Sequence, residues 1–146
     1  MNITVISVGK IKEKYFTAAI DEYSKRLSRF AKLNIIEVAD EKIPDNASEK
    51  EMEQIKEKEG NKILAKLPQN SFVVTLCIEG KEHSSEELAK KIADISMTSS
   101  HITFIIGGSL GLSDTVKSKS ALRLSFGKMT LPHQLMRVVL LEQIYR

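Results

Sequence analysis

Five short apolar runs along the chain have the length and composition of strands. Four of them, at residues 3–8, 33–38, 72–78 and 102–106, are rich in β-branched residues, and a weaker fifth run covers 121–126. Segments with helical periodicity separate most of them. Strands that alternate with helices predict an α/β fold, with a mostly parallel sheet and helices on both of its faces.

The helices are predicted from apolar spacing and from polar start signals. Apolar residues recur every three or four positions over 16–30, which predicts an amphipathic helix that ends with Phe30 on its apolar face. Ser48 is followed by Glu51 and Ser84 by Glu87, the spacing of a capping box. These pairs predict the starts of a long polar helix and of a shorter amphipathic one.

Three polar segments interrupt the periodic pattern and predict loops or turns. They are Pro44-Asp45-Asn46, Pro68-Gln69-Asn70 and Glu79-Gly80-Lys81. The third is expected to end the strand at 72–78 with a turn.

The final helix, predicted over Gln134–Tyr145, is apolar on more than one face. Its apolar residues are Leu135, Met136, Val138, Val139, Leu140, Leu141 and Ile144. A helix that is apolar nearly all round must be buried on several sides. One sheet face cannot supply that burial in so small a chain, so we expect a second copy to cover this helix in a homodimer.

Composition narrows the class of protein. The 146 residues fit one domain, 1–146, and the apolar content of 42% is ordinary for a globular chain. No apolar run is long enough for a membrane span, and the N-terminus lacks a signal-peptide pattern, so we expect a cytoplasmic protein with no membrane partner. Cys77 is the single cysteine, and its place in an apolar strand predicts a small buried hydrophobe.

Charge is mildly positive overall but unevenly placed. The formal net charge is +3, and the segment 117–146 holds six lysines and arginines against one acid, Glu142. An anionic partner would therefore be expected near the C-terminal third. The histidines and Cys77 lack metal-ligand spacing, so no metal site is expected.

The glycines at 107–111 follow the strand at 102–106, where ligands bind in open α/β sheets. Their spacing matches neither the dinucleotide pattern G-x-G-x-x-G nor the phosphate-binding loop. A tight turn and a ligand-binding loop both remain open.

The segment 126–133 offers the second candidate site. Gly127 and Pro132 bracket residues that cannot be regular strand or helix throughout, and their backbone groups could read an adenine edge. His133 and Arg137 are four residues apart and share one face of the predicted helix. Histidine can transfer protons near neutral pH, and arginine can bind a phosphate or a carboxylate. The alternatives are a crossover loop, a helix-start histidine and a surface arginine.

Taken together, these residues resemble the SPOUT methyltransferases, and within them the small family of ribosomal large-subunit pseudouridine methyltransferase H. The matching segments run nearly end to end, and the C-terminal block is the most specific. They are Ile3–Lys10, Lys12–Tyr15, Asp40–Lys42, Lys56–Gly60, Phe104–Ser109 with Gly111, Leu124–Phe126, Lys128–Gln134, Arg137–Leu140 and Glu142–Arg146.

The resemblance implies a SPOUT fold with a C-terminal trefoil knot, S-adenosylmethionine as methyl donor, and N3 of a pseudouridine in helix 69 of 23S rRNA as acceptor. It also implies a homodimer and the ribosome as partner. By position, the cofactor pocket comprises Leu76, Gly107, Phe126, Gly127, Lys128, Met129, Thr130 and Leu131. His133 is the candidate base, and Arg137 and Arg146 are candidate cations or phosphate contacts.

The resemblance also implies a tail beyond the position of Arg146, because members of this family carry one. In those members the tail ends near a Tyr-His pair. We expect the 146 residues alone to bind cofactor weakly and to methylate poorly. The competing function is a non-catalytic ribosome- or rRNA-binding module with the same fold.

Overall fold

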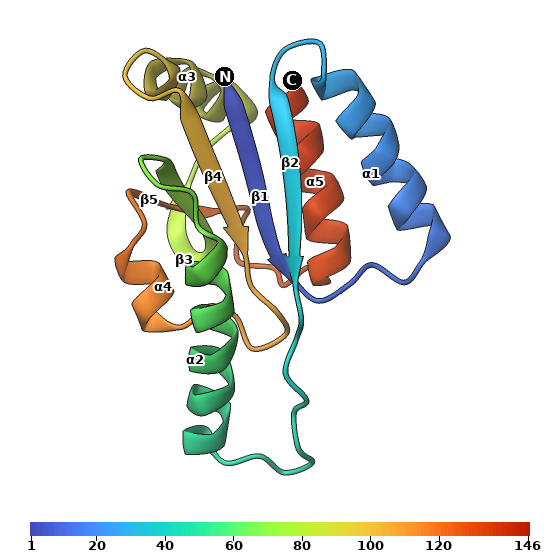
Figure 1. The fold of residues 1–146 in the computed structure, drawn as a ribbon, viewed down its shortest axis with the longest axis vertical. Helices are drawn as coiled ribbons and strands as arrows, with labels where there is room; N and C mark the ends of the chain where they lie inside the picture. Colours follow the sequence, from blue (N-terminus) through green and yellow to red (C-terminus); the bar gives the residue numbers. More distant parts are fainter.

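A five-stranded sheet in the order β2-β1-β4-β3-β5 organises the computed structural model, which describes residues 1–146 (Figure 1). Every paired strand in it is parallel to its neighbour. The strands are Asn2–Val8 (β1), Lys32–Val38 (β2), Phe72–Glu82 (β3), His101–Ile106 (β4) and Leu122–Ser125 (β5). The α/β fold predicted from the alternation of strands and helices is therefore confirmed.

Helices cover both faces of the sheet, as predicted. They are Lys14–Leu27 (α1), Glu49–Lys66 (α2), Ser85–Ser96 (α3), Asp114–Ser118 (α4) and His133–Tyr145 (α5). One buried cluster joins the sheet to α1, α3 and α5 through side chains such as Ile20, Leu88 and Leu140. A second cluster on the other face includes Ile63 of α2 and Val116 of α4. The continuous β-branched strands suit a sheet buried on both sides.

The two predicted capping boxes are present. Ser48 accepts a hydrogen bond from the Glu51 amide while the Glu51 side chain accepts from the Ser48 amide, and Ser84 and Glu87 repeat the arrangement. Each box satisfies two amides that the first helical turn leaves without partners. The short helix α4 was missed, although Ser113 caps it by accepting from the Val116 amide.

The predicted turn at 79–81 is wrong, because β3 continues through it to Glu82. Leu76 and Lys81 both pair with Leu124 of β5, so the pairing register shifts between them in a bulge. Gly80 permits the close approach, since a Cβ there would lie 2.8 Å from backbone atoms of Arg123. The polar residues that resembled a turn belong to an irregular edge of the sheet.

The prediction that Phe30 lies on the apolar face of the first helix is also wrong. Helix α1 ends at Leu27, and Phe30 is 70% exposed. The amide of Ala31 closes the turn by donating to the Leu27 carbonyl, and Lys32 then donates to Met1 as β2 begins beside β1. Pairing of the two strands therefore ends the helix before the apolar spacing does.

The carboxyl ends of all five strands lie at one end of the sheet, and this is where a ligand site is expected (Figure 1). The loops that leave β4 and β5 meet the start of α5 there. None of the five helices combines the length and the apolar content that a bilayer crossing requires. The C-terminal trefoil knot stays a prediction.

Candidate active site

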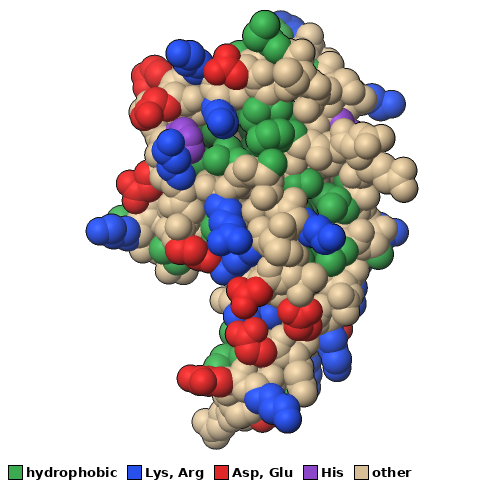
Figure 2. All heavy atoms as spheres, turned by 90° about the vertical axis from the view of Figure 1, so that its left-hand side faces the viewer, with side chains coloured by type: hydrophobic (Ala, Val, Ile, Leu, Met, Phe, Trp, Pro, Cys, Tyr) green, Lys and Arg blue, Asp and Glu red, His purple; other side chains and the backbone are tan.

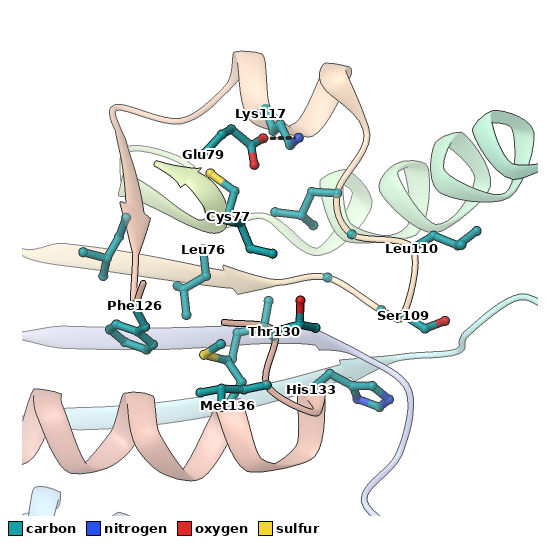
Figure 3. Close-up of a pocket in the computed structure, with 18 of the residues that line it drawn as sticks. Leu76, Cys77, Glu79, Ser109, Leu110, Lys117, Phe126, Thr130, His133 and Met136 are labelled. Atoms are coloured by element: carbon teal, nitrogen blue, oxygen red, sulfur yellow. Dashed lines mark hydrogen bonds and ion pairs between the residues drawn. The ribbon is translucent and has the colours of Figure 1, made fainter. Parts of the chain in front are cut away.

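A cavity of about 340 Å³ opens at the carboxyl edge of the sheet (Figure 3). Its wall is built from the end of β3, the glycine loop after β4, the loop after β5 and the first turn of α5. Eleven of the 21 lining residues are hydrophobic, so the cavity combines apolar walls with a few polar groups, as small-molecule sites do.

The structure brings nearly all the predicted cofactor residues to this cavity. They are Leu76, Gly107, Phe126, Gly127, Met129, Thr130 and Leu131, while Lys128 is outside the lining. His133 lines the cavity as well. Residues that are more than fifty positions apart in the sequence therefore share one site.

The loop after β5 presents free backbone donors. Ser125 folds it back, since its hydroxyl accepts from the Gly127 amide at 3.1 Å and donates to the Gly127 carbonyl at 3.2 Å. Gly127 has φ +120, a conformation that side chains disfavour. The amides of residues 128–131 make no hydrogen bond to the protein. They are available to a bound ligand.

The glycine loop is both a tight turn and part of the cavity wall, so neither earlier alternative excludes the other. The Gly111 amide donates to the Gly108 carbonyl at 3.0 Å. A Cβ on Gly107 would lie 2.8 Å from the Gly111 backbone, so a side chain at 107 would force the turn open. Glycine is needed here for the turn itself.

An ion pair that the sequence analysis missed lies at the cavity. Glu79 of the β3 extension pairs with Lys117 of α4, and both residues line the cavity (Figure 3). The hydrogen bond from Lys117 lowers the pKa of Glu79. No local pattern signals this pair, because it depends on a contact between β3 and α4.

Cys77 is half-buried and faces this cavity instead of the core (Figure 3). Burial raises the pKa of its thiol, and the negative charge of Glu79 adds to the effect. The side chain is therefore a neutral part of the wall at physiological pH.

His133 opens α5 between the cavity and the end of β1. Its Cε1 atom lies 3.6 Å from the position that a Cβ on Gly9 would take, and the Cγ of Asp40 lies 3.9 Å from the same position. Burial lowers the pKa of His133, the charge of Arg137 lowers it further, and Asp40 opposes both. The imidazole is therefore neutral near pH 7, with Nδ1 buried and without a hydrogen-bond partner.

The two candidate arginines lie in very different places. Arg137 is 2% exposed and is absent from the cavity wall, so the surface-arginine alternative is wrong. Arg146 follows the last turn of α5 and pairs with Glu142 in solvent. At about 1.5 Å per residue, α5 separates Arg146 from His133 by roughly 20 Å within one chain.

No cluster of three or more His, Cys, Asp or Glu side chains could hold a metal ion. The polar groups of the cavity are backbone amides, hydroxyls, the Cys77 thiol, one imidazole, the ammonium of Lys56 and the Glu79–Lys117 ion pair. Such groups suit an organic ligand with hydrogen-bond acceptors and a polar end.

Parallel α/β topology, a glycine turn and a second loop with free amides at the carboxyl edge are the features of an α/β enzyme with an organic cofactor. A family model described as "Predicted SPOUT methyltransferase" matches residues 1–146. The chain therefore belongs to the SPOUT methyltransferases, and within them to the family of ribosomal RNA large subunit methyltransferase H, which its relatives define.

Three such relatives carry the name ribosomal RNA large subunit methyltransferase H. The protein from Clostridium novyi is 62% identical, that from Clostridium botulinum strain Kyoto 63%, and that from Clostridioides difficile 60%. Each match covers 100% of this chain and 92% of the relative.

A probable methylase family protein from Haemophilus influenzae shares the fold, with a TM-score of 0.52 at 12% identity. The match covers 99% of this chain and 64% of that one.

Proposed function

We propose that this chain is an rRNA methyltransferase that transfers a methyl group from S-adenosylmethionine to N3 of a pseudouridine in helix 69 of 23S rRNA. The observation that carries the proposal is the cavity, in which free backbone donors and a neutral imidazole share one apolar space. The names of the relatives support rRNA as the substrate.

The residues of the cavity fit S-adenosylmethionine. The free amides of 128–131 suit an adenine edge, and Leu76, Phe126 and Leu131 supply apolar surface for its faces. The Glu79–Lys117 pair offers a carboxylate for hydroxyl donors and an ammonium for a carboxylate. When bound, this cofactor supplies an electrophilic methyl group.

His133 is the base in the proposed reaction. N3 of pseudouridine carries a proton that must leave before or during attack on the methyl carbon. The neutral imidazole of His133 would take that proton, so that N3 could accept the methyl group that S-adenosylmethionine would supply. The lowered pKa of His133 keeps the imidazole in the proton-accepting form.

A homodimer is part of the same proposal. Leu135 and Val139 on α5 remain half-exposed, which supports burial against a second copy. Because Arg146 lies at the far end of α5 from His133, it could contact the reacting nucleotide only at the His133 of the other chain of a dimer. We propose that 1–146 forms one SPOUT domain and acts in the cytoplasm.

The test incubates the protein and methyl-labelled S-adenosylmethionine with large ribosomal subunits and, separately, with bare 23S rRNA. The expected result is one labelled nucleotide, a pseudouridine in helix 69, whose product carries the methyl at N3. A label at another nucleotide would contradict the site assignment, and no label with either RNA would contradict the activity of these 146 residues.

Calorimetry with S-adenosylmethionine separates this enzyme from a non-catalytic rRNA-binding module. The enzyme binds the cofactor, and Phe126→Ala weakens the binding because it removes an apolar wall. A pure binding module takes up rRNA without any measurable heat from the cofactor.

A further inference from the structure

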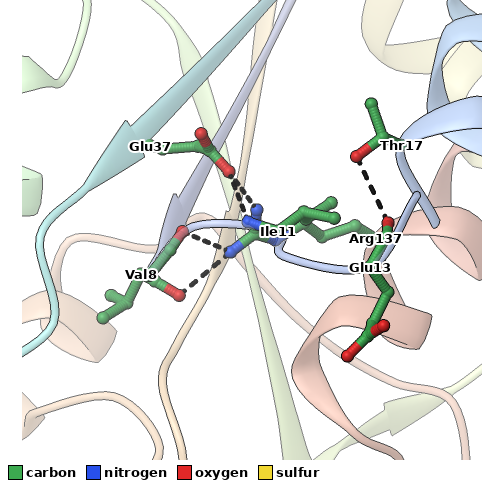
Figure 4. Close-up of polar contacts among 7 residues, drawn as sticks. Val8, Ile11, Glu13, Thr17, Glu37 and Arg137 are labelled. Carbon is green, nitrogen blue, oxygen red and sulfur yellow. Dashed lines mark hydrogen bonds and ion pairs between the residues drawn. The ribbon is translucent and has the colours of Figure 1, made fainter.

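A buried arginine connects the start of α5 to the ends of two strands (Figure 4). The Arg137 Nη1 donates to Glu37 Oε2 at 2.6 Å. Its Nη2 donates to the Val8 carbonyl at 3.0 Å and to the Gly9 carbonyl at 2.6 Å. One guanidinium therefore holds acceptors from β1, β2 and the residue that follows β1.

The same acceptors hold the loop that leaves β1. Glu37 Oε2 also accepts from the Ile11 amide at 3.2 Å, and the Gly9 amide donates to the Val38 carbonyl at 2.8 Å. Gly9 has φ +89, so the chain turns sharply at this point. The amide of Gly9 is therefore held by Val38, and its carbonyl is held by Arg137.

His133 lies beside Gly9, since its Cε1 atom would be 3.6 Å from a Cβ placed on that glycine. His133 therefore has the cavity on one side and, on the other, a backbone turn whose carbonyls Arg137 holds. Arg137 itself has no part in the cavity wall, and its Nη1 and Nη2 atoms already donate to protein acceptors.

We infer that Arg137 is a positioning residue for His133, acting through the Val8–Gly9 carbonyls and Glu37, and not a contact for phosphate or substrate. Replacing a buried ionic group with apolar residues is often neutral or stabilising, so packing alone gives little reason for an arginine here. A planar fork with several donors is what three acceptors in different directions require, and lysine lacks it.

Arg137 affects His133 through its positive charge as well as through the turn that it holds. The charged groups around His133 are Arg137 on its own helix, Asp40 after β2, and Glu37, which is paired with Arg137. Lys10 follows Gly9 in the adjoining loop, and Glu59 of α2 lies beyond Asp40, where it accepts from the Glu41 amide. Arg137 lowers the pKa of His133 and Asp40 raises it, so the two can be removed separately.

The experiment uses the whole chain with Arg137→Lys, Arg137→Gln and Asp40→Asn, and with Arg26→Gln as a control on an exposed arginine of α1. Nuclear magnetic resonance follows the titration of the three histidines, with His133→Gln to assign the signals. Turnover on large ribosomal subunits and calorimetry with S-adenosylmethionine are measured on the same proteins.

Arg137→Gln is expected to raise the pKa of His133, Asp40→Asn to lower it, and Arg137→Lys, which keeps the charge, to leave it in place. Both Arg137 variants should lose roughly 10-fold or more in kcat, since misplacing a catalytic group is costly, while cofactor affinity changes little. Arg26→Gln should match the wild-type protein throughout.

A folded Arg137→Lys protein with wild-type kcat would overturn the inference, and so would an unchanged His133 titration in Arg137→Gln. If Arg137→Gln does not fold, Arg137→Lys and Asp40→Asn still decide the outcome. The assignment of His133 as base rests on the proposed function. If the wild-type protein transfers no methyl group while the titrations shift as expected, the proposed function fails and the positioning role stands.

Discussion

The two ends of α5 carry similar side chains in opposite surroundings. At its start, Arg137 is 2% exposed and donates to one carboxylate and two carbonyls. At its end, the Arg146 side chain is 59% exposed and pairs with Glu142 one turn earlier. Arg26 lies near this end too, over the rings of Tyr23 and Tyr145.

This difference shows that the role of an arginine follows from its acceptors and its burial. Arg137 faces fixed acceptors in a dry setting, so its geometry is determined. Arg146 is exposed and its partner Glu142 is a half-buried side chain on the same helix, and ion pairs with an exposed member contribute little to stability. Both arginines matched family positions, yet only the first is connected to the histidine at the cavity, through the turn at Gly9.

The largest expected effect tests whether chemistry belongs to the start of α5. His133→Ala should lower methyl transfer by about 10²- to 10⁴-fold, the usual contribution of a general base. Single-turnover rates with labelled cofactor on ribosomal subunits measure it. Calorimetry is the control, since cofactor affinity should fall far less than the rate. Unaltered turnover would remove His133 from the reaction.

A smaller effect compares the two arginines in stability. Arg137→Ala should lower the free energy of unfolding by about 2–4 kcal/mol, because it leaves three acceptors without their donor and opens a cavity. Arg146→Ala should change it by less than about 0.5 kcal/mol. Urea denaturation of both variants gives the comparison, and equal losses would contradict the contrast between the two ends.

The middle of α5 provides the next test. Val139→Asp places a charge on the half-exposed apolar side of the helix and should shift a dimer toward monomers, as measured by light scattering after size-exclusion chromatography. Lys66→Asp, at an exposed position of α2, is the matched control and should leave the mass unchanged. A wild-type protein that is monomeric at all concentrations would contradict the proposed dimer.

The smallest expected effect is a shift in the pH dependence of kcat. A base must be unprotonated to act, so the rate falls as pH drops through the pKa of His133. Since burial and Arg137 lower that pKa, the acid limb of kcat should lie below the ordinary histidine value of about 6.5. A limb above that value would show that Asp40 outweighs burial and Arg137.

The regular part of the fold could be predicted because local signals determine it. The capping boxes and β-branched runs act within a few residues, and the structure bears them out. The errors occur where a distant partner decides the outcome. β3 extends past its apolar run because β5 pairs with it, and α1 ends early because β2 must begin beside β1.

The candidate site also has a part that the sequence could predict and a part that depends on distant contacts. Residue patterns marked the glycine loop and the loop after β5 as candidate sites, family resemblance implied their cofactor, and the two loops do line one cavity. Neither the spacing nor the family match could show that Arg137 is buried, because its acceptors come from residues 8, 9 and 37. The pair of Glu79 with Lys117 depends on a contact between β3 and α4 that no local pattern reports.

The contacts of Arg137 also bear on how the protein folds. They join residues separated by 128, 129 and 100 positions in a chain of 146 residues. Contacts of such high sequence separation close large loops, so they form only after β1, β2 and α5 have all assembled. A partly folded chain can hold its sheet and its caps, yet the imidazole would still lack its supporting turn. In the proposed reaction, competence for methyl transfer thus becomes a late event in folding, because an incompletely folded molecule lacks a supported imidazole to take the proton from N3.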